Sequence, residues 1–268
     1  MRADCTALTP PPLRLSGVSV TRDDRTILGP VDWCVDAHER WVVLGPNGSG
    51  KSTMVRIAAL QLHPSVGEVD VLGERLGHTD VRTLRRRIGY AAAALSDMLR
   101  PNIVARDVVM TAKFAALEPW WHSYEDADRA AASACLGRLG IAHLADREFG
   151  TLSSGERQRV LVARTLMGDI GLVLLDEPNA GLDVGGRESL LAGLEQLATD
   201  GDTPAMVLVT HHVEEIPPSF THALLLRDGA ILAAGPIDVT LTAESLSATF
   251  ALPLVLDRRA GRWTAFAA

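Results

Sequence analysis

The sequence has few cysteines and no long apolar run. Its three cysteines, Cys5, Cys34 and Cys135, are scattered without the spacing of a metal site among 268 residues. They indicate a reducing compartment and no disulfide frame. No apolar run approaches the length that spans a bilayer, and residues 1–12 lack the apolar stretch of a signal peptide. We therefore expect a cytoplasmic chain that reaches a membrane only through a partner.

Positive charge is also scarce. The chain has 26 lysines and arginines against 33 aspartates and glutamates, a formal net charge of −7. Binding of nucleic acid needs a basic surface, so we expect no nucleic-acid partner. The densest basic run, Arg82 with Arg85, Arg86 and Arg87, is interpreted as a solvated helix face.

A glycine-rich loop stands between an apolar run and a helical pattern. Residues 41–44 are continuously apolar, as expected for a buried parallel strand, and residues 52–60 have the apolar spacing of a helix. The loop fits G-x-x-x-x-G-K-[ST], a pattern whose backbone N–H groups and helix dipole bind phosphates. An ordinary glycine-rich turn is the alternative, and the full match in this context disfavours it. The expected nucleotide-binding residues are Gly45, Pro46, Asn47, Gly48, Ser49, Gly50, Lys51, Ser52 and Thr53.

Within this loop, two side chains have distinct expected roles. Lys51 is predicted to reach the outer phosphates of a nucleoside triphosphate, and the Ser52 hydroxyl to ligate Mg²⁺. A second apolar strand, residues 171–175, ends at Asp176 and Glu177. Asp176 is predicted to be a further Mg²⁺ ligand, and Glu177 the base that polarises the attacking water. A helix cap or a solvated pair of acids is the alternative.

The order of the patterns indicates an α/β fold. We predict a P-loop NTPase core with a mainly parallel sheet, whose ligand site lies at the carboxyl edge of the strands. An antiparallel β layer comes first, with one strand along residues 13–20 and a second and third within residues 27–35. An inserted α-helical sub-domain has a first helix capped by Asn102 and a second helix from about Glu125 to Leu139.

Five segments together resemble the nucleotide-binding subunit of ABC transporters. The signature reads LSSGE where the family has LSGGQ, and this motif separates ABC ATPases from other P-loop proteins. In the family's order the segments are the Walker A loop at 45–53, the signature motif at 152–156, the Walker B strand at 172–178, the D-loop at 180–183 and the switch histidine at 211.

The resemblance covers residues 13–235 and implies a domain division. Residues 1–12 are expected to form a flexible tail, and residues 13–235 the ABC ATPase domain. Its helical sub-domain is expected at about 91–165, and residues 236–268 are expected to form a C-terminal extension.

The resemblance also implies a head-to-tail homodimer or a pair with another ABC subunit. Each ATP would lie between the Walker loop of one subunit and Ser153 and Gly155 of the other. ATP would close this dimer and hydrolysis would open it. Asp183 would contact the opposite subunit, and His211 would orient the γ-phosphate and the attacking water. His212 has no such support and is left as a surface residue or a supporting neighbour.

Two positions depart from the family's pattern. Arg22 stands where the family usually has an aromatic residue that stacks on adenine, and a planar guanidinium can also stack on a base. Residues 91–95 replace the usual Mg²⁺-binding glutamine with Ala-Ala-Ala-Ala-Leu. Ser96, Asp97 or water would then complete the metal shell.

The resemblance implies an Mg²⁺-dependent ATPase that powers a membrane transporter. It would lie at the inner face of the cell membrane, held by transmembrane permease subunits. Residues 236–254 resemble the C-terminal segment of importers for metal chelates and cobalamin. The pair Trp120 and Trp121 is either a docking surface for such a partner or buried in the helical sub-domain.

Two other functions stay open from the sequence. One is a soluble ABC ATPase without a transporter, for example in iron–sulfur cluster assembly. The other is a nucleotide-binding regulator that barely hydrolyses ATP, which the presence of both Glu177 and His211 argues against.

Overall fold

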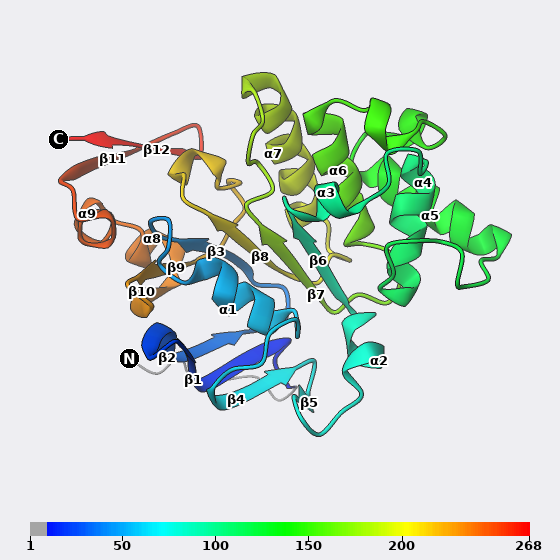
Figure 1. Cartoon of the computed structure of the whole chain (residues 1–268). Helices are drawn as coiled ribbons and strands as arrows, with labels where there is room; N and C mark the ends of the chain where they lie inside the picture. Colours follow the sequence, from blue (N-terminus) through cyan, green and yellow to red (C-terminus); the bar gives the residue numbers. More distant parts are fainter. Residues whose placement is uncertain (1–9) are drawn as a thin grey trace. The chain divides into compact units, whose positions relative to one another are not determined.

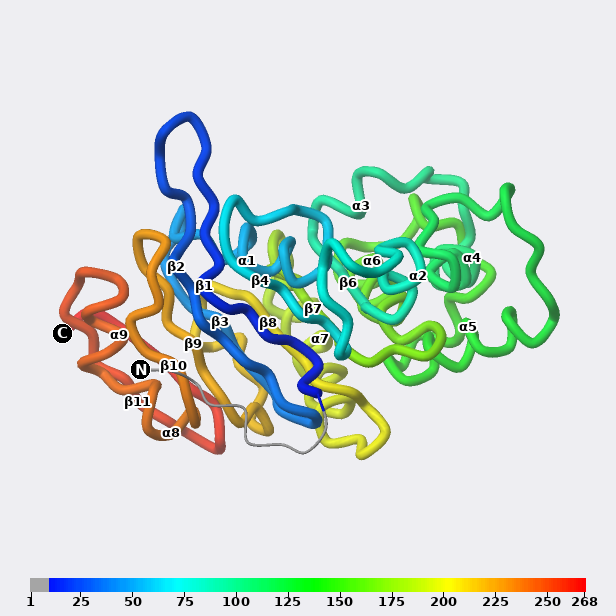
Figure 2. Tube along the Cα trace, turned by 90° about the horizontal axis from the view of Figure 1, so that it is seen from below, coloured from blue at the N-terminus to red at the C-terminus, as the bar shows by residue number. Residues whose placement is uncertain are grey.

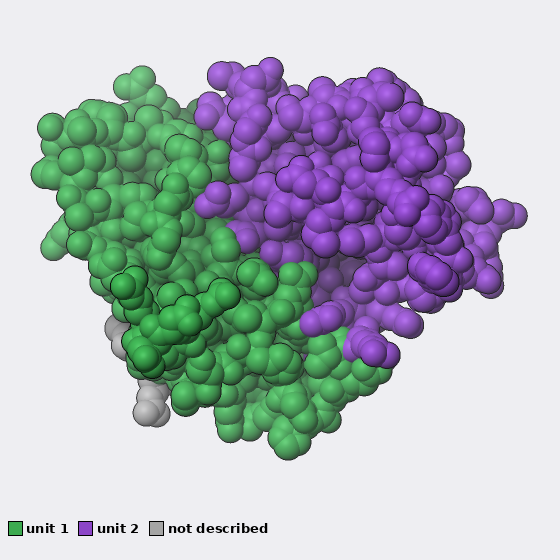
Figure 3. Space-filling model, viewed as in Figure 1, with its two compact units in different colours: residues 1–81, 204–268 green, residues 82–203 purple. Residues whose placement is uncertain are grey.

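The computed structural model describes residues 10–268, which divide into two compact units. Unit 1 combines the N-terminal part up to Val81 with Pro204–Ala268, and unit 2 is the segment 82–203 (Figure 3). Residues 1–9, which hold most of the predicted tail and Cys5, lie outside the described residues.

Unit 1 contains the expected antiparallel layer, with its strands in the order β2-β1-β4-β5 (Figure 1). The predicted second and third strands are one continuous strand. The pairing of this strand with β1 is irregular around Gly29, which has a φ of +96°. Gly29 lies against β1, where an added Cβ would come within 2.1 Å of the Val18 carbonyl oxygen. The strands are β1 (Leu13–Arg22), β2 (Arg25–Val35), β4 (Val66–Val71) and β5 (Glu74–Arg75).

Unit 1 also contains the parallel strands that carry the glycine-rich loop. Strand β3 (Arg40–Leu44) lies between β8 (Ala205–Thr210) and β9 (His222–Arg227) and is parallel to both (Figure 2). Strands β3 and β8 are buried along their whole length, as their continuous apolar sequences predict. Strand β10 (Ala230–Pro236) runs antiparallel on β9, and helix α1 (Lys51–Ala58) follows β3.

The C-terminal part of unit 1 folds into two short helices and a hairpin (Figure 2). The sequence analysis assigned no strands here. Strand β12 packs against η4, the single 3₁₀ turn that follows β8. These elements are η4 (Val213–Glu215), α8 (Ile237–Thr240), α9 (Ala243–Phe250), β11 (Leu254–Arg259) and β12 (Arg262–Ala267).

Unit 2 is mostly helical and contains one pair of parallel strands. Strand β6 (Ile88–Ala92) pairs with β7 (Leu172–Asp176). The α-helices are α2 (Val81–Arg85, which begins in unit 1), α3 (Leu95–Met98), α4 (Ala105–Met110), α5 (Asp126–Arg138), α6 (Ser154–Arg164) and α7 (Val184–Thr199). The 3₁₀ turns are η1 (Thr111–Phe114), η2 (Ala142–Leu144) and η3 (Phe149–Thr151). The predicted α/β fold class, with parallel strands, an antiparallel layer and inserted helices, is confirmed.

The first helix of the insertion begins later than the sequence predicts. Helix α4 starts at Ala105, so Asn102 is not its cap. The backbone N–H groups of Ala105 and Arg106 donate to the carbonyl oxygens of Arg147 and Ala145, each at 2.9 Å. A neighbouring loop therefore satisfies the donors that a side-chain cap usually satisfies. The second helix agrees with prediction, since α5 covers Asp126–Arg138. The Glu125 N–H donates to the Asp128 carboxylate at 3.0 Å and so ties the start of this helix.

The cysteines differ from expectation in one respect. Cys34 is disulfide-bonded, whereas the sequence indicated no disulfide frame. Cys135 is a buried free thiol, and burial raises its pKa. Within residues 10–268, no helix combines the length and apolar character needed to cross a membrane.

Candidate functional site

In unit 1 the glycine-rich loop folds around a lysine. The loop leaves strand β3 at Leu44, and helix α1 begins at Lys51, which is 4% exposed. The Lys51 ammonium donates to the carbonyl oxygens of Gly45 at 2.8 Å and Pro46 at 3.0 Å. No side chain caps α1 at Gly50. A cationic side chain and an uncapped helix N-terminus therefore share one loop, an arrangement that favours anions.

Two glycines allow the loop to lie against neighbouring backbone. A Cβ at Gly45 would lie 2.1 Å from the Leu226 carbonyl oxygen, and one at Gly50, where φ is +100°, would lie 3.0 Å from the Ile27 carbonyl oxygen. The Gly229 N–H donates to the Ser49 carbonyl at 3.0 Å. Strand β2 and the β9–β10 turn thus fix the loop from two sides.

His211 lies at the same sheet edge as this loop. In the parallel pairing of β3 with β8, Leu44 is opposite Thr210, so the loop and His211 both begin where their strands end. His211 is half-buried, and its ring centroid lies 4.1 Å from that of His212. The structure therefore places His211 and residues 45–53 at the same edge of the sheet.

Arg22 is exposed at the end of β1, one of the two strands of the β1–β2 hairpin. It pairs in register with Arg25, and the same hairpin continues to Ile27, the residue beside Gly50. The hairpin that carries Arg22 therefore contacts the phosphate loop through its second strand.

In unit 2 the two adjacent carboxylates lie at the end of β7. Asp176 is 8% exposed and is paired in register with Ala92 of β6. Glu177 has a φ of +50°, a left-handed conformation that is uncommon for residues other than glycine. Its carbonyl accepts the Ala180 N–H at 3.1 Å. The strand therefore ends abruptly between Asp176 and Glu177, and the two carboxylates do not continue one strand.

The residues of the signature and the D-loop lie at two neighbouring helix N-termini in unit 2. Ser153 caps α6: its N–H donates to the Glu156 carboxylate at 2.8 Å, and its hydroxyl accepts the Glu156 N–H at 3.3 Å. Asp183 caps α7 by accepting the Gly186 N–H at 2.7 Å. A Cβ at Gly155 would lie 3.1 Å from the Gly186 Cα atom, so the two helix starts are in close contact.

Asn179 is a residue of this region that the sequence analysis missed. It is 4% exposed, and neither polar atom of its amide has a hydrogen-bond partner within the described residues. In the sequence, only its position directly after Asp176, Glu177 and Pro178 could have marked it as a site residue. Asparagine is common in turns, so the residue type alone gives no such indication.

The segment after β6 contains the two residues that were expected to replace the family's Mg²⁺-binding glutamine. Ser96 and Asp97 lie on the one-turn helix α3, where Ser96 is half-buried and Asp97 is exposed. Across residues 10–268 there is no cluster of three or more histidine, cysteine, aspartate or glutamate side chains that could hold a metal.

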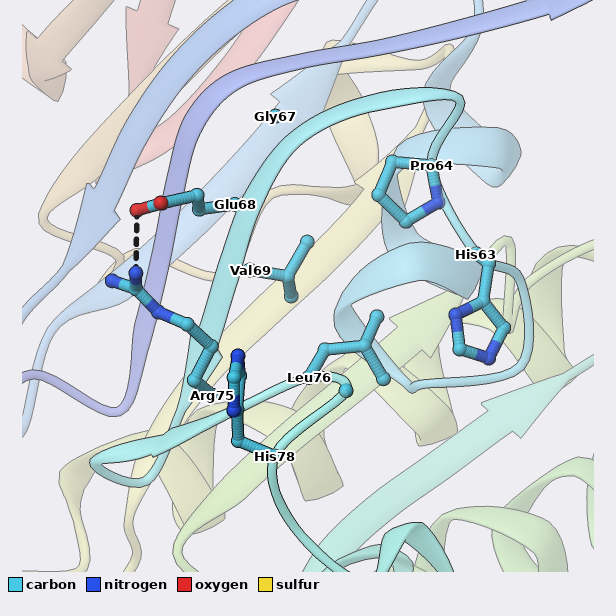
Figure 4. Close-up of a pocket in the computed structure, with 9 residues that line it drawn as sticks. His63, Pro64, Gly67, Glu68, Val69, Arg75, Leu76 and His78 are labelled. Atoms are coloured by element: carbon cyan, nitrogen blue, oxygen red, sulfur yellow. Dashed lines mark ion pairs between the residues drawn. The ribbon is translucent and has the colours of Figure 1, made fainter.

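A separate pocket in unit 1 contains none of the predicted site residues (Figure 4). It has a volume of about 300 Å³ and contains an ion pair between Arg75 and Glu68 at 2.8 Å. Its lining also includes His63 and His78, both exposed. This pocket is therefore separate from the phosphate loop.

Comparisons with known proteins agree on one family. The family model described as ABC transporter matches residues 28–180. The chain is 39% identical to an ABC transporter ATP-binding protein of Bacillus subtilis, over 90% of this chain and 92% of the relative. It is 34% identical to the hemin import ATP-binding protein of Nocardia farcinica, over 91% and 85% of the two chains.

Solved structures give the same result. A transporter described as of the metal-chelate ABC type, in an inward-facing conformation, matches with a TM-score of 0.76 and 25% identity over 97% of both chains. A dimeric ATP-binding cassette bound to ADP and phosphate matches with a TM-score of 0.71 and 25% identity, over 84% of this chain and 98% of the other.

The cap of α6 leads to a stability prediction. Replacing Glu156 with alanine removes the acceptor for the Ser153 N–H and should lower the free energy of unfolding by about 0.5–1.5 kcal/mol, measured by urea denaturation. Glu156→Gln is the matched control because glutamine keeps the reciprocal cap.

This contribution should depend on pH. The hydrogen bond from the Ser153 N–H is the main cause that holds the pKa of Glu156 below its ordinary value. The advantage of the wild type over Glu156→Gln should therefore be present above the pKa of glutamate in the unfolded chain. It should disappear as the pH falls through the lower pKa of the folded state. An advantage that grows on acidification would contradict this assignment.

Proposed function

The chain belongs to the ABC transporter family, whose members bind and hydrolyse ATP, and on this premise we propose that it powers the import of a metal or metal chelate. Relatives that share 32–34% identity are named for hemin import, ferric enterobactin transport and manganese transport. These names favour a transporter subunit over a soluble ABC ATPase.

The observation that supports ATP binding in this proposal is the loop around Lys51. Its ammonium lies 2.8 and 3.0 Å from two loop carbonyls, at the start of an uncapped helix. We propose that the phosphates of ATP enter this loop and take over the contacts of Lys51. The backbone N–H groups of residues 45–53 would surround the same anion.

The residues predicted to hold Mg²⁺ have suitable chemistry. Ser52 offers an exposed hydroxyl in unit 1, and Asp176 offers a carboxylate at the end of a buried strand in unit 2. Both are the hard oxygen ligands that Mg²⁺ prefers. Bound Mg²⁺ would neutralise charge on the phosphate oxygens. In this proposal Glu177 polarises the attacking water, and His211 orients that water and the γ-phosphate.

We propose that ATP closes a head-to-tail dimer. Ser153 and Gly155 of one subunit would contact the γ-phosphate that the loop of the other subunit holds, and Asp183 would contact the opposite subunit. The placement of Ser153 and Gly155 at the start of α6 supports the contact with the γ-phosphate, because helix N-termini attract anions. Arg22 would stack on the adenine base.

A pair of exposed tryptophans supports a permease partner. Trp120 is 61% exposed and Trp121 83% exposed, so the alternative that both indoles are buried is wrong. The Arg100 guanidinium lies 4.1 Å from the centroid of the Trp120 ring and pairs with Glu118 at 2.8 Å. This contact holds one indole at the surface. We propose that the two tryptophans dock on the permease subunits at the inner face of the membrane.

We also propose a domain organisation for the chain. Residues 13–235 would act as the ATPase domain, with residues 91–165 as its helical sub-domain. Residues 236–268 would act as an extension of that domain.

Replacing Glu177 with glutamine tests the catalytic proposal. Turnover of ATP should fall by at least about 100-fold, because a general base contributes this much or more. ATP should still bind, so an ATP-bound dimer should accumulate in size-exclusion chromatography. Glu148→Gln, which changes an exposed carboxylate of the same unit, is the matched control. Retained turnover in Glu177→Gln would remove its role as base.

Replacing the two tryptophans with charged residues tests the docking proposal. The double variant Trp120→Glu, Trp121→Glu should keep basal ATP hydrolysis and lose co-sedimentation with membranes that contain the permease. Val239→Glu, at a side chain that is 77% exposed on α8, should behave as wild type. Unchanged co-sedimentation of a folded double variant would exclude the docking surface.

A further inference from the structure

The 3₁₀ turn η4 follows the switch histidine after one intervening residue. His211 and His212 lie between the end of β8 at Thr210 and the start of η4 at Val213. Contacts that fix η4 in place therefore also restrict the backbone of His211. Two adjacent glutamates join this turn to other elements: Glu215 bonds to Thr210 at the end of β8, and Glu214 bonds to β12.

Glu215 holds the turn from inside the fold. It is 6% exposed, and its carboxylate accepts the hydrogen bond of the Thr210 hydroxyl, which is itself fully buried. The same hydroxyl oxygen accepts the His212 N–H at 3.1 Å. The residues on both sides of His211 are thus joined through one hydroxyl, and a buried carboxylate fixes that hydroxyl.

Glu214 holds the turn from the C-terminal hairpin. Its carboxylate accepts the Ala265 N–H of β12 at 3.2 Å, and its carbonyl accepts from the Arg262 guanidinium at 2.9 Å. The turn of the hairpin approaches the same segment, since a Cβ at Gly261 would lie 3.3 Å from Pro218.

The hairpin itself is anchored to the rest of the extension. The Arg258 guanidinium pairs with Asp238 of α8 at 2.8 Å and lies 4.7 Å from the centroid of the Trp263 ring. Trp263 is 9% exposed. The contacts of β12 with η4 therefore connect the whole extension to the segment that carries His211.

We propose that Glu214 and Glu215 are positioning residues for His211, and that the C-terminal hairpin sets the rate of ATP hydrolysis through Glu214. This inference rests on the proposed role of His211. Neither glutamate contacts ATP in the proposal. Each acts by fixing the backbone on which His211 stands, Glu215 from the core and Glu214 from β12.

The test compares Glu214→Ala with Glu214→Gln in steady-state ATP hydrolysis by the full chain. Losing one hydrogen bond to the hairpin should lower kcat by about 3- to 10-fold, with KM and the affinity for a fluorescent ATP analogue unchanged. Glu214→Gln should restore most of the rate, because the amide oxygen still accepts the Ala265 N–H. Glu244→Ala, at an exposed glutamate of the same extension, is the matched control.

A double-mutant cycle separates positioning from a general structural effect. Glu214→Ala should cause no further loss in a His211→Ala background, because the residue that it positions is already gone. Arg262→Gln weakens the second hydrogen bond between β12 and η4, which runs from the Arg262 guanidinium to the Glu214 carbonyl. This variant should show the same loss of kcat.

Four results would overturn the inference, and they fall into two kinds. An unchanged kcat in Glu214→Ala, or the same fold loss with and without His211, would contradict it while leaving the proposed function intact. Wild-type protein without ATPase activity, or full activity in His211→Ala, would instead contradict the proposed function or the role of His211, and the inference with them.

Discussion

The close backbone contact at Gly45 is the constraint on which the nucleotide site depends. The loop passes so near the Leu226 carbonyl that no Cβ fits between them. The shape of the loop therefore depends on the pairing of β9 beside β3, and the β9–β10 turn also fixes Ser49 through Gly229. A site whose motif is local in the sequence is thus built by residues about 180 positions apart.

The helix after the phosphate loop differs at its N-terminus from the helices that follow the signature and the D-loop. In unit 1, helix α1 has no side-chain cap, and Lys51 lies within the preceding loop. In unit 2, Ser153 and Asp183 cap α6 and α7 with their own side chains. An uncapped terminus keeps its N–H donors for an anion, whereas a capped terminus is stable without one. This contrast is consistent with the proposed roles, in which the loop holds the triphosphate and the signature helix of the other subunit meets it on dimer closure.

Much of the fold could be predicted because its central strands are continuous apolar runs, as in β3, β7 and β8. The phosphate loop was equally readable, because its glycines and Lys51 have fixed spacing. Features that depend on tertiary contacts could not be predicted from such local sequence patterns. Asn102 looks like a cap, yet the backbone of another loop satisfies the start of α4. The exposure of Trp120 and Trp121 and the attachment of Glu214 to β12 also depend on packing that no short pattern encodes.

In the proposed function this protein works on a membrane permease. The most direct measurement is purification of the tagged full-length protein from native membranes with ATP and Mg²⁺, with its partners identified and quantified by mass spectrometry. We expect a polytopic membrane protein in stoichiometric amount. Soluble partners alone, or no partner, would contradict this proposal and indicate an ABC ATPase that works without a transporter.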